Sequence, residues 1–370
     1  MPPTSIALIE QGIAQGLHLG AQLYVSRGGR VIADAGIGQS RPGVAMSADT
    51  SMAWQSAGKP LTAVAVGKLW ETGRLHLDDP AARFIPEFGV HGKEMITIRH
   101  LLTHTAGIRW ANFSAGDDWD RVMEAINTVR PEPRWTAGQK AGYHALTSWY
   151  VLGEIIRRMM GRDFETALRA MVLEPMGMNN TICHLSAEQE RDNPHYSGLY
   201  NTKGGQMIED RSTIEICSPG SSLRGPMREL GKFYEVLLKR LGTDADGSDN
   251  SMIHPQTIEA MTARHRVGMF DHTFKRILDW GLGFIVNSQY LGGNIPYGFG
   301  DHASMRAFGH GGRQSAIAFA DPENQLVVAL AFNGMPGEKE NDQRTRPILT
   351  ALYEELVPAK NGDSADSSRS

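Results

Sequence analysis

Hydrophobic positions repeat with two different periods along this chain, and each change of period marks a new element. Near the N-terminus the apolar residues recur every three or four positions, namely Ile6, Ile9, Ile13 and Leu17. This spacing predicts a helix from about Thr4 to Gly16. Two β-rich runs follow, at residues 21–26 and 31–36, on either side of a Gly-Gly turn within Arg27–Arg30. They predict an antiparallel hairpin.

The middle of the chain has mostly helical patterns. A first helix is predicted from Ser56 to Trp70, with Gly73 as its C-terminal glycine. Between Thr105 and Gly283 the helical period dominates, and Gly- and Pro-rich loops separate the segments. The clearest of these helices are predicted at residues 149–160, 164–173 and 228–241.

Strand-like patterns return near the C-terminus. Two apolar runs, residues 315–321 and 325–333, flank the turn Pro322–Asn324 and predict a second hairpin. A last helix is predicted over Pro347–Leu356. The polar, Ser-rich residues 358–370 are expected to be a disordered tail.

Strands at both ends of the chain can pair in one antiparallel sheet only if the middle forms its own lobe. The predicted fold class is therefore an α/β (α+β) sandwich, in which terminal helices flank the sheet and a mainly helical domain is inserted. We expect residues 1–104 and 285–357 to form the sheet domain and residues 105–284 to form the insert. A cleft between the two is a natural ligand site.

Composition and charge narrow the classes of function. The 370 residues are 41% hydrophobic and 21% charged, so a globally disordered chain is excluded. A formal net charge of -4 without a basic segment argues against a nucleic-acid partner. No apolar run reaches the roughly 20 residues of a membrane span, and the first residues do not resemble a signal peptide. We expect a cytoplasmic protein without a membrane partner, whose two cysteines, Cys183 and Cys217, are free core thiols.

One short motif suggests nucleophilic chemistry. In the run Ser56-Ala57-Gly58-Lys59, the hydroxyl and the amine stand three residues apart, which places them on one face of a helix. A neutral amine next to a serine hydroxyl can take its proton and activate it as a nucleophile. The start of a helix also supplies N–H groups and a positive dipole end for a developing oxyanion. The motif alone is weak, because an N-cap serine beside a solvated lysine has the same pattern.

The surrounding runs make the motif specific. In chain order these runs are Trp54–Ala63, Gly73–Pro80, Phe84–Phe88, Ile96–Ile108, Gly142–Ala145, Trp149–Glu154, Glu174–Met178 and Phe308–Gly312. Taken together, they strongly resemble the serine β-lactamase and penicillin-binding-protein superfamily, and within it the class C β-lactamase-like branch that includes the family VIII carboxylesterases. It implies a β-lactamase/transpeptidase-like fold over most of the chain.

The resemblance also implies roles for three motifs. The first supplies the nucleophile Ser56 and its partner Lys59. The second is usually Tyr-x-Asn but here reads Tyr143-His144-Ala145, so the tyrosine is kept and the amide is lost. The third is usually Lys-Thr-Gly but here reads His310-Gly311-Gly312, without the lysine. Both departures resemble esterase-like members and disfavour β-lactam and peptidoglycan substrates.

These motifs predict a catalytic set. Ser56 would attack an acyl carbon, while Lys59 and Tyr143 hold and pass its proton; the sequence does not decide which of the two is the general base. The backbone N–H groups of Ser56 and Arg313 would form the oxyanion hole. The third motif and its successor, His310, Gly311, Gly312 and Arg313, are predicted to bind the substrate.

Other readings of the candidate residues remain. His100 and His104 stand four residues apart, as metal ligands on a helix can, but no acidic neighbour or third ligand is apparent, so we expect no metal and no cofactor. His144 is expected to be structural. The predicted function is a serine hydrolase that forms an acyl-enzyme on Ser56, most simply a carboxylesterase acting on small or medium esters or amides. The alternatives are a biosynthetic acyltransferase on the same scaffold and, less favoured, a β-lactamase or DD-peptidase. The oligomeric state stays open.

Overall fold

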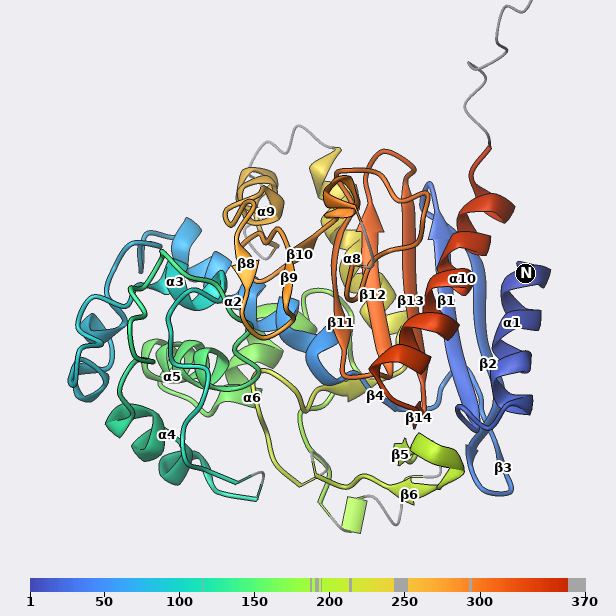
Figure 1. Cartoon of the computed structure of the whole chain (residues 1–370), viewed down its shortest axis with the longest axis horizontal. Coiled ribbons are helices and arrows are strands. Elements are labelled where there is room, and N and C mark those ends of the chain that lie inside the picture. The colour runs from blue at the N-terminus through green and yellow to red at the C-terminus, as the bar shows by residue number, and fades with distance from the viewer. Residues whose placement is uncertain are drawn as a thin grey trace, which may run out of the picture.

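A computed structural model describes residues 1–114, 116–186, 188–189, 193, 195–212, 215–242, 252–292 and 295–358 of the chain. A sheet with helices on both faces forms one side of the molecule, and a group of helices, α2 to α6, lies beside it (Figure 1). The prediction of a tail at 358–370 falls almost wholly outside the described residues.

The main sheet joins the two ends of the chain. Its seven strands run in the order β10-β11-β12-β13-β1-β2-β3, and all neighbours are antiparallel. The strands are β1 (Gly20–Arg27), β2 (Arg30–Arg41), β3 (Val44–Ala45), β10 (Ile285–Val286), β11 (Phe308–Gly312), β12 (Ala316–Asp321) and β13 (Leu326–Phe332). Both predicted hairpins are present, and β1 pairs with β13 so that Leu23 lies opposite Leu330.

The alternation of side chains along the central strands explains why helices cover both faces. On one face, Ile317, Phe319 and Leu330 pack in a core with residues of α1 (Pro3–Ala14) and α10 (Glu338–Leu356). On the other face the smaller Ala318 and Ala329 belong to the core that includes α2 (Lys59–Glu71), α5 (Thr147–Met160) and α8 (Met227–Leu241). Strands buried on both sides lack the polar alternation of a solvated sheet face.

Short elements complete the structure. The other helices are α3 (Ile98–Leu102), α4 (Trp119–Thr128), α6 (Phe164–Leu168), which continues as a π-helical turn over Arg169–Leu173, and α9 (Pro255–Thr262). The minor strands are β4 (Met52–Ala53), β5 (Tyr200–Asn201), β6 (Ile208–Glu209), β7 (Arg224–Gly225), β8 (Phe270–Asp271), β9 (Arg276–Ile277) and β14 (Gly334–Met335). Single 3-10 turns are η1 (Gln55–Gly58), η2 (Ala81–Arg83), η3 (Pro86–Phe88), η5 (Lys203–Gly205) and η6 (Gln289–Leu291).

The last helix is longer than the sequence predicts. It begins at Glu338 rather than Pro347, and the proline lies inside it. The domain division at 105 and 284 stays a proposal; α8, within the predicted insert, packs on β1, β12 and β13. No helix among the described residues combines the length and the apolar composition that a membrane crossing needs.

The prediction of free thiols is wrong. Cys183 and Cys217 form a disulfide with their Cα atoms 5.0 Å apart. They are separated by 34 positions in the sequence. A pair of cysteines has no spacing that would reveal such a contact from the sequence alone.

Candidate active site

Ser56 lies on η1, the 3-10 turn directly in front of α2, with Lys59 as the first residue of that helix. The turn begins with a strained residue, because the buried Gln55 has a φ of 51°. Non-glycine residues rarely adopt positive φ, and such strain concentrates at functional sites. Pro60 at the start of α2 fixes the first helical turn. Ser56 is half-buried at the edge of a cavity.

Lys59 is fully buried and touches three oxygen atoms. Its Nζ lies 2.9 Å from Ser56 Oγ, 2.8 Å from the carbonyl oxygen of Ala145 and 2.5 Å from that of Gly220. Burial lowers the pKa of Lys59 well below its usual range. A neutral amine has two N–H groups and one lone pair; with its N–H groups on the two carbonyls, the lone pair would be left for the serine, whereas an ammonium would donate to Ser56 as well.

Tyr143 lies next to the amine of Lys59. The lysine Nζ is 5.3 Å from the centre of its ring, and the phenol hydrogen-bonds to Ser56. Burial raises the pKa of Tyr143, the Ser56 hydrogen bond lowers it, and the charge of Asp271 raises it further, so the net shift is upward. The phenol is therefore protonated at neutral pH. Two separate motifs thus bring three side chains close together, those of Ser56, Lys59 and Tyr143.

The third motif occupies β11. The buried His310 faces the ring of Tyr143 at a centroid distance of 6.0 Å, and its Nδ1 lies 2.6 Å from the carbonyl oxygen of Gly311. That contact assigns the proton to Nδ1, which donates to the carbonyl. Burial, with a smaller effect of Lys59, lowers the pKa of His310 to about 3, so its imidazole is neutral.

The two glycines of β11 are required by close packing. A Cβ at Gly311 would lie 2.0 Å from the ring of Tyr297, and one at Gly312 would lie 2.3 Å from the carbonyl oxygen of Trp54. Both distances are far below a van der Waals contact. The end of β11 is therefore packed tightly against the segment that leads to Ser56.

Arg313 presents its side chain to solvent at the rim of the cavity. The side chain is 59% exposed, and its Nη1 lies 3.4 Å from Asp210 Oδ2. It is within the lining of the cavity that holds Ser56. The guanidinium could therefore meet an anionic part of a ligand, in competition with Asp210.

The cavity above Ser56 has a volume of about 400 Å³ and a largely apolar wall. Its aromatic and aliphatic lining residues are Phe113, Leu146, Tyr150, Ile216, Phe274 and Tyr297. Ser56, Tyr143 and His310 open into the same space. A few convergent polar groups in an apolar cavity are typical of a small-molecule site.

The remaining histidine candidates have local structural contacts. His144 is buried and its Nε2 accepts a hydrogen bond from the backbone N–H of Ile108. His104 Nδ1 accepts from the N–H of His144, and His100 Nδ1 accepts from the N–H of Thr97. No cluster of three metal-ligating side chains occurs among the described residues.

Comparison with known proteins shows the family of this chain. The Beta-lactamase family profile matches residues 6–353. The chain belongs to this family.

Relatives of this β-lactamase-family chain include esterases. Esterase EstB of Burkholderia gladioli is 28% identical over 370 residues, which cover 90% of this chain and 91% of that protein. A solved family VIII carboxylesterase is 23% identical with a TM-score of 0.75, covering 95% of this chain and 97% of the other. EstCE1, described as a hydrolase with promiscuous acyltransferase activity, is 19% identical with a TM-score of 0.77, covering 95% and 98%. The predicted superfamily, fold class and serine-hydrolase type are confirmed at the level of the family.

Several parts of this family member's site were not predicted from the sequence. The carbonyls of Ala145 and Gly220 hold Lys59, and the Asp271 carboxylate binds the backbone of Tyr143. A backbone carbonyl leaves no trace in the residue type. Asp271 stands 128 positions from Tyr143, so no local pattern connects them. The apolar cavity wall resembles ordinary core in the sequence.

Proposed function

We propose that this protein is a serine hydrolase of the SxxK type that forms an acyl-enzyme on Ser56, and that its substrates are small or medium carboxylic esters, with amides as a further possibility. The observation that carries the proposal is the contact between Lys59 Nζ and Ser56 Oγ at 2.9 Å, with two carbonyls taking the amine N–H groups. A buried neutral amine in that position is a general base for the serine.

The pKa shifts support a division of roles between Lys59 and Tyr143. Lys59, whose pKa is lowered, accepts the proton of Ser56 as the hydroxyl attacks the acyl carbon. Tyr143, whose pKa is raised, stays protonated and donates to the departing alkoxide, and Lys59 then returns a proton to the phenol. The two groups thus form one proton-handling unit, with Lys59 as base and Tyr143 as acid.

The oxyanion hole is assigned to the backbone N–H groups of Ser56 and Arg313. The tight packing of Gly312 against Trp54 supports this assignment, because it holds the end of β11 beside η1. Two N–H donors on rigid elements are preorganised for the negative charge of the tetrahedral intermediate. His310, Gly311 and Arg313 then line the path of the substrate beside the scissile bond.

The cavity wall supports ester substrates that carry an apolar group. Aromatic rings such as Tyr150 and Phe274 favour burial of an alkyl or aryl part of the ligand. The same wall gives little reason to propose a β-lactam or a cell-wall peptide. His310 is neutral where the third motif usually presents a cation, and Ala145 contributes its carbonyl to Lys59 rather than an amide to the substrate.

An acyltransferase is the second candidate. The chemistry up to the acyl-enzyme is the same, and an apolar cavity that limits water would favour transfer to another acceptor. Among the described residues of the cavity, Arg313 and Glu338 are the charged side chains that could orient such an acceptor.

A cytoplasmic location remains a prediction. The Cys183–Cys217 disulfide weighs against it, because disulfides persist mainly in oxidising compartments.

The test of the proposal is Ser56→Ala against Ser221→Ala, a second serine of the same cavity. A serine-directed phosphonate should add its mass to the wild-type and Ser221→Ala proteins but not to Ser56→Ala. Turnover of a nitrophenyl ester should fall by several orders of magnitude in Ser56→Ala alone. An adduct that persists in Ser56→Ala would show that another residue is the nucleophile.

A further inference from the structure

A buried ion pair lies behind Tyr143 and has no role in the chemistry so far described. Arg266 Nη2 and Asp271 Oδ2 are 3.1 Å apart, and their side chains are 1% and 0% exposed. Removing two charges from water costs several kcal/mol per ion, so such a pair is weak evidence for stability alone. The residues around the Arg266–Asp271 pair indicate another role for it.

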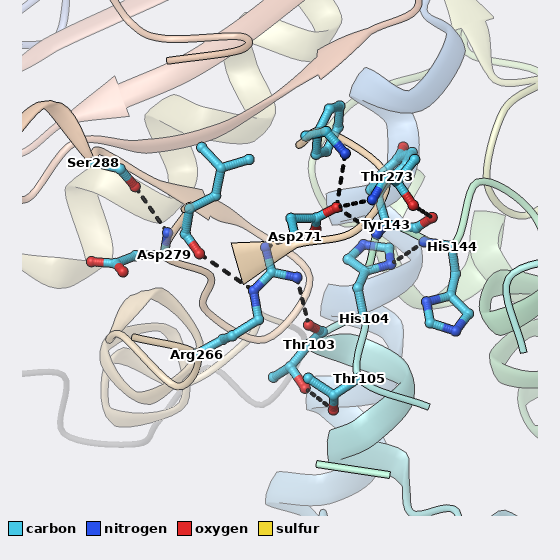
Figure 2. Close-up of polar contacts among 12 residues, drawn as sticks. Thr103, His104, Thr105, Tyr143, His144, Arg266, Asp271, Thr273, Asp279 and Ser288 are labelled. Carbon is cyan, nitrogen blue, oxygen red and sulfur yellow. Dashed lines mark hydrogen bonds and ion pairs between the residues drawn. The ribbon is translucent and has the colours of Figure 1, made fainter. Parts of the chain in front are cut away.

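Asp271 binds the backbone of the catalytic tyrosine. Its Oδ1 accepts hydrogen bonds from three N–H groups, those of Tyr143 at 3.1 Å, Thr273 at 2.8 Å and Phe274 at 2.9 Å. The hydroxyl of Thr273 donates to the carbonyl oxygen of Tyr143 at 3.0 Å. Figure 2 shows the Asp271 carboxylate directed at the Tyr143 segment, between Arg266 and Thr273. Both backbone polar groups of Tyr143 are thus held, one by Asp271 at the end of β8 and the other by Thr273 in the turn that follows.

The same contacts continue into the neighbouring segment. The N–H of His272 donates to the carbonyl oxygen of Ala141 at 2.9 Å, and Ala141 pairs with Asp271 in an isolated parallel bridge. Phe274 packs on the ring of Tyr143 at a centroid distance of 4.9 Å. The strand pair β8–β9 therefore clamps Tyr143 through its main chain and its ring.

Arg266 fixes the carboxylate from the other side. Its Nη1 donates to the carbonyl oxygen of Thr103 at 3.2 Å, and its guanidinium lies 5.0 Å from the ring centre of Trp280. Trp280 in turn packs beside Tyr143 at 5.8 Å and His310 at 5.4 Å. Arg266 thus links the segment around Thr103 to Asp271 at the end of β8.

We propose that Asp271, held in place by Arg266, is a positioning residue that fixes Tyr143 for proton transfer to the leaving group. The proposal rests on the proposed function, since it assumes that Tyr143 handles that proton. One of the three N–H groups on that carboxylate oxygen belongs to Tyr143 and two belong to the turn after β8, so this atom joins the turn to the Tyr143 segment. The negative charge of Asp271 also disfavours ionisation of the phenol, which keeps it a proton donor.

The first test compares two buried aspartates. Asp279 is also fully buried and ion-paired, with Arg264 at 2.9 Å, but its carboxylate binds Arg264, the N–H of Gly268 and the hydroxyl of Tyr290 instead of the Tyr143 segment. Asp271→Ala should lower kcat on an alkyl ester about 10- to 100-fold, because small displacements of a catalytic group have effects of that size. The loss should be less than about threefold on a nitrophenyl ester, whose leaving group needs no proton. Asp279→Ala should lower the rates on both esters by one common factor.

The second test separates positioning from loss of stability. In Arg266→Met/Asp271→Asn the asparagine oxygen can still accept the three N–H groups, while both charges are removed. We expect most of the alkyl-ester activity to return, even if the melting temperature stays lower. In a Tyr143→Phe background, Asp271→Ala should change the residual rate by less than about twofold, because the residue acts through the missing phenol.

The outcomes distinguish a failure of the positioning role from a failure of the proposed function. Equal losses on both esters, or an Asp271→Ala effect that is unchanged in Tyr143→Phe, would overturn the positioning role. If Tyr143→Phe itself keeps wild-type activity on the alkyl ester, the proposed proton donor is wrong, and the failure lies with the function rather than with Asp271. Circular dichroism and a thermal melt on every variant establish that each rate belongs to folded protein.

Discussion

The amine of Lys59 lies 2.9 Å from the hydroxyl of Ser56 and also contacts two backbone carbonyls, those of Ala145 and Gly220. In the neutral amine these carbonyls take both N–H groups. In this arrangement the lone pair is the part of the amine left for the serine. An ammonium would instead give its third N–H to Ser56 and could not accept the serine proton. The protonation state of one buried lysine thus controls the nucleophile, and burial favours the active, neutral form.

The pH dependence of kcat/KM should therefore reflect Lys59 on its acid side. Activity is expected to rise with pH as Lys59 loses its proton, and this rise should lie well below the usual lysine range near 10.5, because burial lowers that pKa. The fall at high pH should lie above 10, because the pKa of Tyr143 is raised. Initial rates with an uncharged ester between pH 4 and 10 measure the acid limb and should show no fall at the alkaline end.

His310 provides the control for this profile. Its pKa is lowered to about 3, so it stays neutral through the working range. His310→Asn should change the height of the profile but leave the acid limb in place. An acid limb that disappears in His310→Asn would assign the titration to the histidine and contradict the role of Lys59.

Lys59 and Tyr143 should behave as one unit when they are replaced. Lys59→Ala and Tyr143→Phe are each expected to reduce kcat by several orders of magnitude, and the double variant should be little worse than either. Lys59→Arg should fail as well, because a guanidinium cannot release its proton near neutral pH. Single-turnover acylation rates measure each variant; fully multiplicative losses would mean that the two residues act in different steps.

The course of the sheet could be predicted because its determinants are local. The runs around Gly28 and around Pro322–Asn324 combine β-rich segments with turn residues, and both hairpins formed within one residue of the predicted bounds, except that β2 continues to Arg41, five residues beyond its predicted end. The last helix was predicted too short, because its first half is polar and Pro347 resembles a helix start. In the fold, Asn341 and Arg344 of that half are buried; Arg344 donates to the carbonyl oxygens of Gly334 and Gln314, so tertiary contacts stabilise a turn that local pattern does not favour.

The candidate site likewise has residues that the sequence predicts and contacts that it does not predict. Ser56, Lys59, Tyr143 and His310 could be found because family motifs place a specific side chain at a specific position. The partners of these residues could not, since Lys59 is held by backbone carbonyls and Tyr143 by a carboxylate that is remote in sequence. Gly311 was predicted to bind the substrate, and in the structure its missing Cβ also makes room for the ring of Tyr297.

The Cys183–Cys217 disulfide should be detectable and should support the site. Cys217 is three residues before Gly220, whose carbonyl holds Lys59, and Cys183 Sγ also contacts Ser222 in the same segment. Thiol titration of the unfolded, unreduced protein should find no free thiol, and two after reduction. In the chain-entropy account, a loop of this size is worth about 3 to 4 kcal/mol, so Cys183→Ser/Cys217→Ser should have a clearly lower melting temperature. Two free thiols in protein purified without reductant would restore the original prediction.

The fate of the acyl-enzyme decides between the two proposed functions. Water is abundant, so a hydrolase needs only to admit it to the ester carbon on Ser56, whereas a transferase must exclude it and orient an acceptor. Because water needs no dedicated acceptor site, we expect hydrolysis to dominate with simple esters. Turnover of a nitrophenyl ester should then release free acid in step with nitrophenol, and added alcohols or amines should change the rate by less than about twofold. Arg313→Ala is the matched variant, since it removes a candidate acceptor contact without touching the proton-handling pair. An acyl-enzyme that accumulates in water, seen by intact mass, and turns over only with a particular acceptor would keep the chemistry of Ser56 and reassign the protein as an acyltransferase.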